Sequence, residues 1–330
     1  MYVVTGGAGF IGSNLVAGLE ESAAGDIVVC DRLGSDDKWR NIAKRDLVDI
    51  IPPEHLESYI KSNATRVDAL LHMGAISATT ELNADLIIEQ NFRLSCSLWN
   101  ICKTEKIPFI YASSAATYGA GENGFLDNAS RLELSKLRPL NAYGWSKHLF
   151  DRWVARKTEN WISEEYESQW VGLKFFNVYG PNEYHKNNMI SVALKNFKEI
   201  KAGGPAVLFK SHNPLYSDGG QMRDFIWVGD CIKVILWLLK NPQISGLFNL
   251  GTGRAQSFDE LVNAVYLAMG KTPQIQYVET PIEIREKYQY FTQADIGKLR
   301  AHGYKSEFKT VEEGVREYVQ SFLRSDDPYK

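Results

Sequence analysis

The first half of the chain alternates short apolar runs with longer segments of helical periodicity. The apolar runs have the length and the β-branched content of buried strands. They cover residues 2–5, 27–30, 69–72, 109–113 and 171–176. The helical segments between them cover residues 11–21, 84–104 and 142–157. Because strands that alternate with helices form βαβ units, the pattern predicts an α/β fold with a Rossmann-type, doubly wound parallel sheet covered by helices on both faces.

The pattern changes after about Tyr179. Residues 203–205 and 211–220 are rich in glycine, proline and polar side chains, which predicts loops. A helical segment at 230–240 and an apolar run at 246–250 follow and are expected to return to the sheet. A further helix at 258–269 is expected to end at Gly270.

These changes predict two domains. Residues 1–178 form the dinucleotide-binding Rossmann domain, and parts of residues 223–256 complete it. Residues 179–330 form mainly a smaller, mixed α/β substrate-binding region.

Composition narrows the range of partners. The chain has 330 residues and a formal net charge of -3, so no strong basic field is present to hold a nucleic-acid backbone. The four cysteines include no CxxC pair, which indicates reduced structural thiols and no metal site. The chain opens on Tyr2-Val3-Val4 without the pattern of a secretion signal, and the apolar run at 234–239 is too short to span a bilayer. We expect a cytoplasmic protein without nucleic-acid or membrane partners.

A glycine-rich turn joins the first predicted strand to the first predicted helix. Gly7-x-Gly9-x-x-Gly12 has the spacing of the dinucleotide fingerprint, and Gly6-x-x-Gly9-x-x-Gly12 has a variant of that spacing. Glycine permits a tight turn and a close approach of the backbone to a pyrophosphate, which then binds at the helix N-terminus. Asp31 ends the second strand, where an acid that binds the ribose is expected. The sequence therefore predicts a bound nicotinamide dinucleotide.

The residues around Asp31 leave two cofactors open. A carboxylate accepts hydrogen bonds from the free 2′-hydroxyl of NAD, whereas Arg32, Lys38 and Arg40 could neutralise the 2′-phosphate of NADP. We expect NADP, with NAD as the alternative.

Tyr143 and Lys147 lie four residues apart on a predicted helix, so they share one face of it. A neighbouring ammonium and a positive nicotinamide ring would lower the pKa of the phenol and make tyrosinate a base near neutral pH. Ser114 follows a strand at the carboxyl edge of the predicted sheet, where ligands bind. Its hydroxyl can bind the same substrate oxygen that Tyr143 deprotonates.

With these motifs the chain resembles the extended short-chain dehydrogenase/reductase superfamily over nearly its whole length. Further matching stretches are residues 177–181, 223–230 and 249–253. The resemblance implies a nucleotide-linked sugar as substrate and Ser114, Tyr143 and Lys147 as the catalytic set. It also implies that Arg223 contacts the diphosphate, for which a guanidinium is well suited. The alternative for Arg223 is a surface ion pair with Asp224.

Dehydratases of this superfamily need acids directly after the serine or threonine position. Ala115 and Ala116 occupy those positions here. Dehydration therefore loses support, and epimerases, dehydrogenases and reductases remain.

More specific stretches resemble the ADP-L-glycero-D-manno-heptose 6-epimerase family, which supplies precursors of the lipopolysaccharide core. They are residues 79–81, 111–119, 175–181, 185–186, 246–255, 257–258, 288–289 and 291–295. The resemblance implies oxidation of an ADP-heptose at C6, followed by return of the hydride to the other face of the carbonyl. In this family a lysine, here Lys186, is the second group that transfers a proton. The rivals are a nucleotide-sugar epimerase acting at C4, a nucleotide-sugar dehydrogenase or reductase, and a protein that binds the cofactor without catalysis.

The same resemblance assigns the remaining site positions. Cofactor contacts are implied for Gly6, Gly9, Phe10, Ile11, Gly12, Asp31, Arg32, Lys38, Met73, Gly74, Ala75, Ile76, Ser77, Asn91, Tyr143, Lys147, Val178 and Lys186. Substrate contacts are implied for Asn177, Asn188, Lys195, Phe209, Lys210, Ser211, His212, Arg223 and Tyr288. The family also implies a homo-oligomer, a pentamer.

The chain departs from the family pattern at several places. Pro53 stands near the position of a basic residue, which weakens the case for NADP. Asn188 replaces a small residue, Lys195 replaces a histidine, and the loop at 211–222 is longer. The rim of the substrate pocket is therefore expected to differ.

Overall fold

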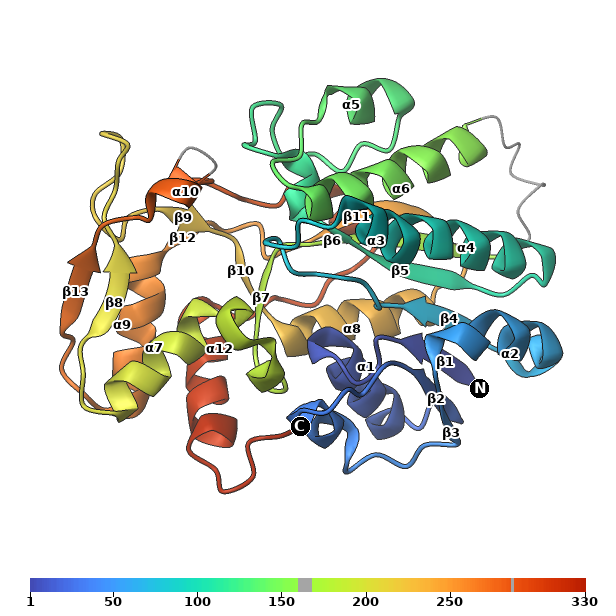
Figure 1. The fold of residues 1–330 in the computed structure, drawn as a ribbon, viewed down its shortest axis with the longest axis horizontal. Coiled ribbons are helices and arrows are strands. Elements are labelled where there is room, and N and C mark those ends of the chain that lie inside the picture. The colour runs from blue at the N-terminus through green and yellow to red at the C-terminus, as the bar shows by residue number, and fades with distance from the viewer. Residues whose placement is uncertain (160–167, 286–287) are drawn as a thin grey trace.

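The computed structural model describes residues 1–159, 168–285 and 288–330 (Figure 1). A seven-stranded sheet lies at its centre, and every pair of neighbouring strands is parallel. In sheet order the strands are β11 (Gly246–Leu250), β6 (Trp170–Phe175), β5 (Phe109–Ser114), β4 (Ala69–His72), β1 (Tyr2–Thr5), β2 (Ile27–Cys30) and β3 (Asp49–Ile51). The order reverses between β1 and β4, so a crevice opens at the carboxyl ends of these two strands. The predicted doubly wound parallel sheet is confirmed.

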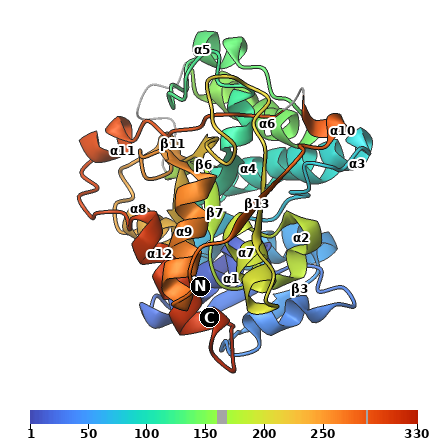
Figure 2. The same ribbon diagram turned by 90° about the vertical axis from the view of Figure 1, so that its left-hand side faces the viewer.

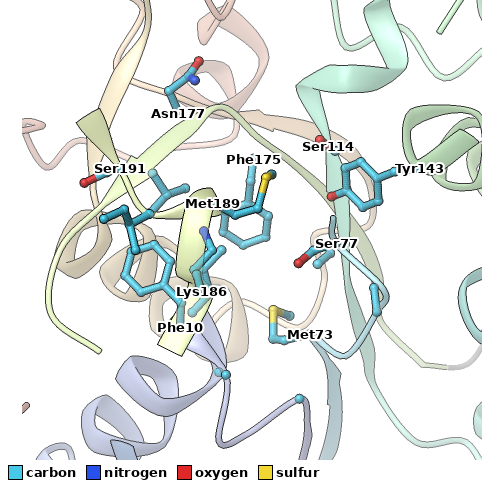
Figure 3. Close-up of a pocket in the computed structure, with 18 of the residues that line it drawn as sticks. Phe10, Met73, Ser77, Ser114, Tyr143, Phe175, Asn177, Lys186, Met189 and Ser191 are labelled. Carbon is cyan, nitrogen blue, oxygen red and sulfur yellow. The ribbon is translucent and has the colours of Figure 1, made fainter. Parts of the chain in front are cut away.

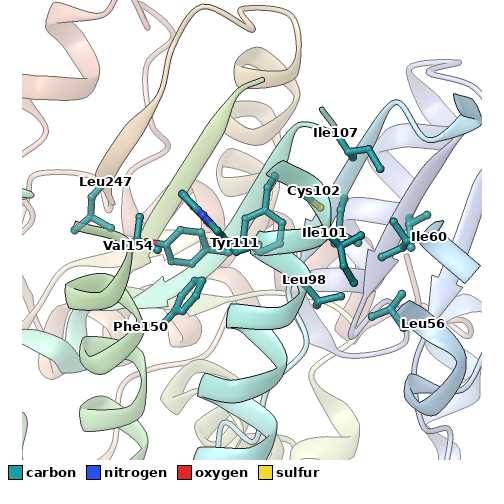
Figure 4. Close-up of a cluster of buried hydrophobic side chains, with 14 of the residues drawn as sticks. Leu56, Ile60, Leu98, Ile101, Cys102, Ile107, Tyr111, Phe150, Val154 and Leu247 are labelled. Carbon is teal, nitrogen blue, oxygen red and sulfur yellow. The ribbon is translucent and has the colours of Figure 1, made fainter. Parts of the chain in front are cut away.

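Helices cover both faces of the sheet (Figures 1 and 4). One face packs against α2 (Leu56–Ser62), α4 (Leu94–Thr104) and α6 (Ala142–Thr158), and the other against α1 (Phe10–Glu21) and α8 (Val228–Leu239). Successive strand residues point to opposite faces, so Val3 lies in the first core and Val4 in the second. Because both faces are buried, the strands are unbroken apolar runs, and that is why the sequence revealed them.

The edge strand β3 was not predicted. It has three residues, and its first two, Asp49 and Ile50, are exposed. A strand this short and this open has neither an apolar run nor a clear alternation, so its position depends on pairing with β2.

The predicted helix at 84–104 is interrupted. It begins as α3 (Ala84–Ile87), passes through the π-helical segment η4 (Ile88–Arg93) and continues as α4. In η4 the side-chain amide of Asn91 binds the backbone of Ile76 in both directions, at 2.8 and 3.0 Å. The hydroxyl of Ser95 donates to the carbonyl of Asn91 at 2.7 Å. The prediction of one regular helix was wrong here, because these contacts with the loop after β4 and within the helix accompany the widened turn.

A second layer of structure covers the carboxyl edge of the sheet, on the left of Figure 1 and facing the viewer in Figure 2. Its helices are α7 (Val192–Lys201), α9 (Phe258–Met269) and α12 (Val311–Glu317), and its strands β8 (Ala206–Phe209) and β13 (Ile275–Val278) pair in parallel. These elements share their own apolar core. We call this layer the cap.

The boundaries of α9 agree with the sequence. Ser257 and Glu260 form a reciprocal capping box at its start, and Gly270 ends it in a left-handed conformation with φ 68°. Residues 211–220 lie between β8 and β9 with turns and no helix or strand, as predicted.

Two further strand pairs and several short elements complete the connections. The strands are β7 (Asn177–Tyr179), paired with β10 (Phe225–Trp227), and β9 (Met222–Arg223), paired with β12 (Gln256–Ser257). The short helices are η1 (Asp37–Ile42), η2 (Pro53–His55), η3 (Ala64–Arg66), η5 (Ala115–Tyr118), α5 (Arg131–Lys136), η6 (Tyr184–Met189), α10 (Ile282–Arg285), α11 (Gly297–Ala301) and η7 (Tyr318–Leu323). Helix α8 and strand β11 return from the cap to the main sheet, as the sequence predicted for residues 230–250. None of the helices within the described ranges is long and apolar enough to cross a membrane.

The core beneath α4 generates a stability prediction. The side chain of Trp99 is 1% exposed, and its ring contacts those of Phe109, Phe150 and Trp170, with centroids 5.4–6.4 Å apart. Replacing this indole by a methyl group leaves a cavity that the surrounding rings fill only in part. Trp99→Ala should lower the free energy of unfolding by about 3–5 kcal/mol, measured by chemical denaturation.

The matched control is Trp39→Ala, because the Trp39 side chain is 48% exposed. It should change the free energy of unfolding by no more than about 0.5 kcal/mol. Equal losses in the two variants would show that the Trp99 cluster does not carry this stability.

Candidate active site

A cavity of about 830 Å³ opens at the carboxyl edge of the sheet, beneath the cap. Its walls come from the loop between β1 and α1, from the ends of β2, β4 and β5, and from η6, α7, β8 and β9. Figure 3 shows side chains from both layers entering it. The cavity has the size and position expected of a ligand site in a doubly wound fold.

The glycine loop forms one end of the cavity. Gly6 has φ 63°, a left-handed conformation that favours glycine, and a Cβ on Gly12 would lie 2.1 Å from the carbonyl oxygen of Gly6. Gly9 is the N-cap of α1. Because glycine has no side chain, it cannot accept a hydrogen bond from the first N–H groups of α1. Gly6, Gly9 and Gly12 line the cavity, whereas Gly7 packs on Val29. This arrangement fits a pyrophosphate, with the variant glycine spacing facing it.

Asp31 lies at the end of β2 and already accepts several hydrogen bonds. One of its oxygens accepts from the N–H of Ala8 at 2.9 Å. The other accepts from the Nζ of Lys38 at 2.7 Å and from the N–H of Arg32 at 2.8 Å. The side chain of Arg32 pairs with Glu54 at the surface. The charge of Asp31 is therefore partly offset by Lys38, and both cations stay close to where a ribose would bind.

The loop after β4 forms a second wall. Met73, Gly74, Ala75, Ile76 and Ser77 all line the cavity. Asn91, predicted as a cofactor contact, lies behind this loop and holds it through Ile76. It also donates to the hydroxyl of Ser146 at 3.0 Å, so it ties the loop to α6.

Ser114 and Tyr143 lie side by side at the cavity (Figure 3). Ser114 ends β5 and caps η5, because its Oγ accepts from the N–H of Ala116 at 3.1 Å. Tyr143 lies in the first turn of α6, which begins where the side chain of Asn141 accepts from the N–H of Gly144 at 2.8 Å. Ser114 also hydrogen-bonds the phenol of Tyr143. The sequence prediction that these two hydroxyls converge agrees with this arrangement.

Lys147 lies one turn further along α6, and its Nζ donates to the carbonyl of Ala112 at 2.8 Å. Burial lowers the pKa of Lys147 to about 8, although the carboxylate of Asp151 opposes the shift. Burial also raises the pKa of Tyr143 and outweighs the opposing hydrogen bond with Ser114. In the chain without a nicotinamide ring the pKa of Tyr143 is therefore raised, because desolvation of the phenolate is the largest effect. A pKa lowered by that ring and by Lys147 stays a prediction.

Lys186 enters the cavity from a different side than Tyr143 (Figure 3). It lies in η6, with its Nζ 5.2 Å from the centre of the Phe10 ring. Burial lowers the pKa of its ammonium, and Glu183 opposes that shift. The buried carboxylate of Glu183 also accepts from the hydroxyl of Ser191 at 2.7 Å and from the phenol of Tyr318 at 3.1 Å. Glu183 therefore closes the turn that carries Lys186 and ties it to the cap.

Arg223 lies on β9, in the substrate half of the cavity. It is 7% exposed, and its guanidinium lies over the rings of Phe258 and Tyr288, at 5.5 and 5.4 Å. Its Nη1 donates to the carbonyl of Met222 at 2.9 Å. Within the described ranges, no carboxylate comes within ion-pair distance of this guanidinium. A buried cation without a counter-ion at a cavity wall fits an anionic ligand.

The predicted alternative for Arg223, an ion pair with Asp224, is wrong. Asp224 is fully buried and accepts from the N–H groups of Thr252 and Gly253, in the turn after β11, and from that of Ala294, at 2.7–3.0 Å. These donors satisfy the carboxylate and leave Arg223 to the cavity.

Most of the other predicted positions also line the cavity. They are Phe10, Ile11, Lys38, Val178, Asn177, Lys195, Phe209 and Tyr288. Asn188, Lys210, Ser211 and His212 lie outside its lining. Lys210 and His212 instead contact Glu279, at 3.0 and 3.3 Å, and the N–H of Ser211 donates to Asp218 at 2.8 Å. These contacts place residues 210–212 at the outer rim, whereas Gln221, near the end of the same loop, lines the cavity.

Sequence reasoning missed several residues of the lining. Met189 and Ser191 line the cavity (Figure 3) without a motif that would reveal them, and Phe175, in a family-specific stretch, lines it although it was given no contact role. His185 lines it too, and its place beside Lys186 was a usable signal. No cluster of three or more metal-binding side chains occurs in the parts of the chain that the structure describes.

Comparisons with known proteins agree with this site. Residues 2–251 match the NAD dependent epimerase/dehydratase family. The chain therefore belongs to that family. The family's description names NAD, a dinucleotide of the class that the glycine loop and Asp31 fit.

Longer matches define the group within the family. The ADP-L-glycero-D-manno-heptose-6-epimerase of Fusobacterium nucleatum subsp. nucleatum is 44% identical, and that of Nitratidesulfovibrio vulgaris is 47% identical; each alignment covers 100% of both chains. A crystal structure of the Helicobacter pylori ADP-L-glycero-D-manno-heptose-6-epimerase superposes with a TM-score of 0.79 at 28% identity, over 97% of this chain and 95% of that one. The chain belongs with the ADP-L-glycero-D-manno-heptose-6-epimerases.

The geometry of the glycine loop predicts the effect of one methyl group. Gly12→Ala should weaken dinucleotide binding at least about tenfold, because the new Cβ would displace the carbonyl of Gly6 from the turn. Binding is measured by titration with NADP⁺ and NAD⁺. In the control Gly204→Ala, the nearest atom to the new Cβ is 3.6 Å away, and binding should stay at the wild-type level. Unchanged affinity in Gly12→Ala would remove the loop from the cofactor site.

Proposed function

We propose that the protein interconverts ADP-D-glycero-D-manno-heptose and ADP-L-glycero-D-manno-heptose by transient oxidation at C6. The observation that carries this proposal is the pair of proton-transferring side chains, Tyr143 and Lys186, which enter one cavity from different sides. The secondary hydroxyl points in different directions in the two epimers, so an epimerase needs an acid–base group for each direction. A dehydrogenase that handles one epimer needs only one.

A bound nicotinamide supplies the hydride acceptor and returns the hydride. The chain supplies the proton transfers and the positioning. In one epimer Tyr143 takes the proton of the substrate hydroxyl, and Ser114 donates a hydrogen bond to the same oxygen. In the other epimer Lys186 takes that proton, and burial, which lowers the pKa of its ammonium, favours the neutral amine that accepts it. When one group has taken the proton of the hydroxyl, the other group donates its own proton to the carbonyl oxygen as the hydride returns to the opposite face.

The diphosphate of the nucleotide sugar is proposed to bind Arg223. Its guanidinium lies over two rings, and among the residues that the structure describes it donates to one acceptor, the carbonyl of Met222, which leaves N–H groups to bind two phosphate oxygens. Asn177, Lys195, Phe209 and Tyr288 complete the proposed substrate contacts, since they line the same half of the cavity.

The main rival is a nucleotide-sugar epimerase that acts at C4. It would use the same Ser114, Tyr143 and Lys147. However, the C4 hydroxyl is attached to a carbon of the sugar ring, and the sugar needs a different motion to present the other face of a ring carbon to the hydride. Lys186, held in place by the hydrogen bonds of Glu183 to Ser191 and Tyr318, favours the C6 reaction. Incubation with ADP-heptose and separation of the two epimers tests the choice, and an absence of interconversion would refute the C6 assignment.

We further propose NADP as the preferred cofactor. Lys38 and Arg32 lie at the Asp31 end of the cavity, and Lys38 already offsets the carboxylate that would repel a 2′-phosphate. A 2′-phosphate at this end of the cavity would have Lys38 and Arg32 as cationic partners. NAD remains the alternative, since Asp31 keeps its place at the end of β2.

The cofactor proposal predicts a selective loss. Lys38→Met should weaken NADP⁺ binding about tenfold or more, because a charge-assisted hydrogen bond is lost, and it should affect NAD⁺ less. Isothermal titration with both dinucleotides measures the ratio. The control is Lys44→Met, whose Nζ pairs with Asp327 at the surface and should leave both affinities unchanged. Equal effects of Lys38→Met on the two cofactors would exclude contact with a 2′-phosphate.

The catalytic proposal predicts two separate losses. Tyr143→Phe and Lys186→Met should each lower kcat for epimerisation by about 10²–10⁴-fold, because each removes one proton-transferring group. The cofactor should stay bound in both variants, as its absorbance in the purified protein will show. The control Lys195→Met removes a predicted substrate contact and should raise KM more than it lowers kcat. Wild-type activity in Tyr143→Phe or in Lys186→Met would remove that residue from the mechanism.

Other expectations from the sequence remain predictions. They are the two-domain division at about residue 178, the cytoplasmic location, and assembly into a homo-oligomer, a pentamer by family resemblance.

A further inference from the structure

A buried ion pair lies directly behind the catalytic side chains. The carboxylate of Asp151 on α6 and the Nζ of Lys174 on β6 are 2.9 Å apart, and both side chains are 0% exposed. Two charges removed from water are costly, and an apolar pair of the same size is often as stable. No step of the proposed reaction uses either residue. The position of the pair, and not its contribution to stability, therefore needs a reason.

Asp151 continues the catalytic face of α6. Tyr143, Lys147 and Asp151 are spaced four residues apart, so they lie in one row along the helix. The row faces β5, where Asp151 accepts from the hydroxyl of Ser113 at 2.7 Å and from the phenol of Tyr111 at 3.1 Å. The carboxylate thereby fixes α6 to the strand that ends in Ser114.

Lys174 connects Asp151 to the segment that follows Ser114. Its Nζ donates to the hydroxyl of Thr117 at 2.6 Å, and that hydroxyl donates to the carbonyl of Ser114 at 2.8 Å. The ammonium also lies 4.7 Å from the centre of the Tyr118 ring. A chain of polar contacts therefore runs from Asp151 through Lys174 and Thr117 to the backbone of Ser114.

We propose that the Asp151–Lys174 pair is a positioning device, which holds Ser114 against Tyr143 and fixes the electrostatic balance at Tyr143 and Lys147. This inference rests on the catalytic roles proposed above for those three residues. Neither Asp151 nor Lys174 lines the cavity.

The electrostatic part of this role has a direction. Asp151 raises the pKa of Lys147 and also raises the pKa of Tyr143. Removing its charge should lower both pKa values. Lys147 would then lose its ammonium at a lower pH, and Tyr143 would form tyrosinate at a lower pH. Both limbs of a bell-shaped rate profile should therefore move toward acid.

Other charged or titratable groups surround the pair and stay in place in the test. Tyr111 on β5 donates to Asp151, Tyr118 on η5 lies beneath the ammonium of Lys174, and His148 on α6 interacts electrostatically with both members of the pair. One step further out, His72 on β4 interacts with Lys147, and Arg152 on α6 interacts with His148. Burial holds the pKa of His72 at about 3 and that of His148 at about 4, so both imidazoles are neutral across the range of the test. Burial raises the pKa values of Tyr111 and Tyr118 well above the usual value, so neither phenol ionises there.

The test compares pH profiles of kcat/KM for wild type, Asp151→Asn and the double variant Asp151→Asn/Lys174→Met. In Asp151→Asn both limbs should move by about one pH unit toward acid, because Asp151 attracts the ammonium of Lys147 and repels the phenolate of Tyr143. The double variant removes one charge of each sign, so its limbs should move less in the same direction. Asp326→Asn, on the exposed C-terminal turn, is the control and should leave both limbs in place.

Loss of positioning has a separate signature. The double variant should fold, because no uncompensated charge remains, yet its kcat should fall about tenfold to a hundredfold as Ser114 loses its support. Its KM should change less than its kcat. If Asp151→Asn alone does not fold, the double variant decides, because wild-type kcat together with wild-type limbs in that variant would overturn the proposal.

A readout without turnover separates this proposal from the proposed function. Protein labelled at the ¹³Cζ of tyrosine gives a Tyr143 resonance, assigned by its loss in Tyr143→Phe. Its titration midpoint, followed by NMR, should be lower in Asp151→Asn or in the double variant than in wild type. An unmoved midpoint in a folded variant would refute the positioning role even if wild type epimerises ADP-heptose. A lowered midpoint would support that role even if wild type does not.

Discussion

The site depends on the packing of α6 against the carboxyl end of β5. Gly144 makes this packing close, since a Cβ there would lie 2.8 Å from the carbonyl oxygen of Ala116. The contact puts Tyr143 beside Ser114, brings Lys147 to the carbonyl of Ala112 and sets Asp151 against Ser113. One helix face thus aligns a phenol, an ammonium and a carboxylate along a single strand, and the cavity opens where the strand ends.

A second, independent contact supplies the other side of the reaction. The turn that carries Lys186 is closed by Glu183, whose partners Ser191 and Tyr318 belong to the cap. The Rossmann layer therefore provides one proton-transferring group, and the turn that joins it to the cap provides the other. Both groups line the same cavity. Burial raises the pKa of Tyr143 and lowers that of Lys186, and each shift favours the neutral form of the side chain.

The sequence predicted the features that depend on residues close together in the chain. The central strands were readable because both faces of the sheet are buried, and the glycine loop and the Tyr143–Lys147 pair were readable because their spacing fixes their geometry. Contacts between distant segments were not readable. Asp224 accepts hydrogen bonds from Thr252 and Ala294, which lie far from it in the sequence. The π-helical turn at Asn91 is hydrogen-bonded to the loop after β4. The raised pKa of Tyr143 follows from burial, which no motif contains, and family resemblance placed Lys210 and His212 at the substrate although they contact Glu279 at the rim.

The central claim is that one carbon loses a hydride and regains the same hydride on its other face within a single binding event. The most direct measurement uses ADP-heptose that carries deuterium at C6, incubated with the enzyme in ordinary water with unlabelled reduced cofactor added. The account predicts that the product epimer keeps its deuterium at C6 in full, as mass spectrometry and NMR of the isolated sugar will show. Protium at C6 of the product would contradict it, because the hydrogen would then have come from the solvent or from free cofactor.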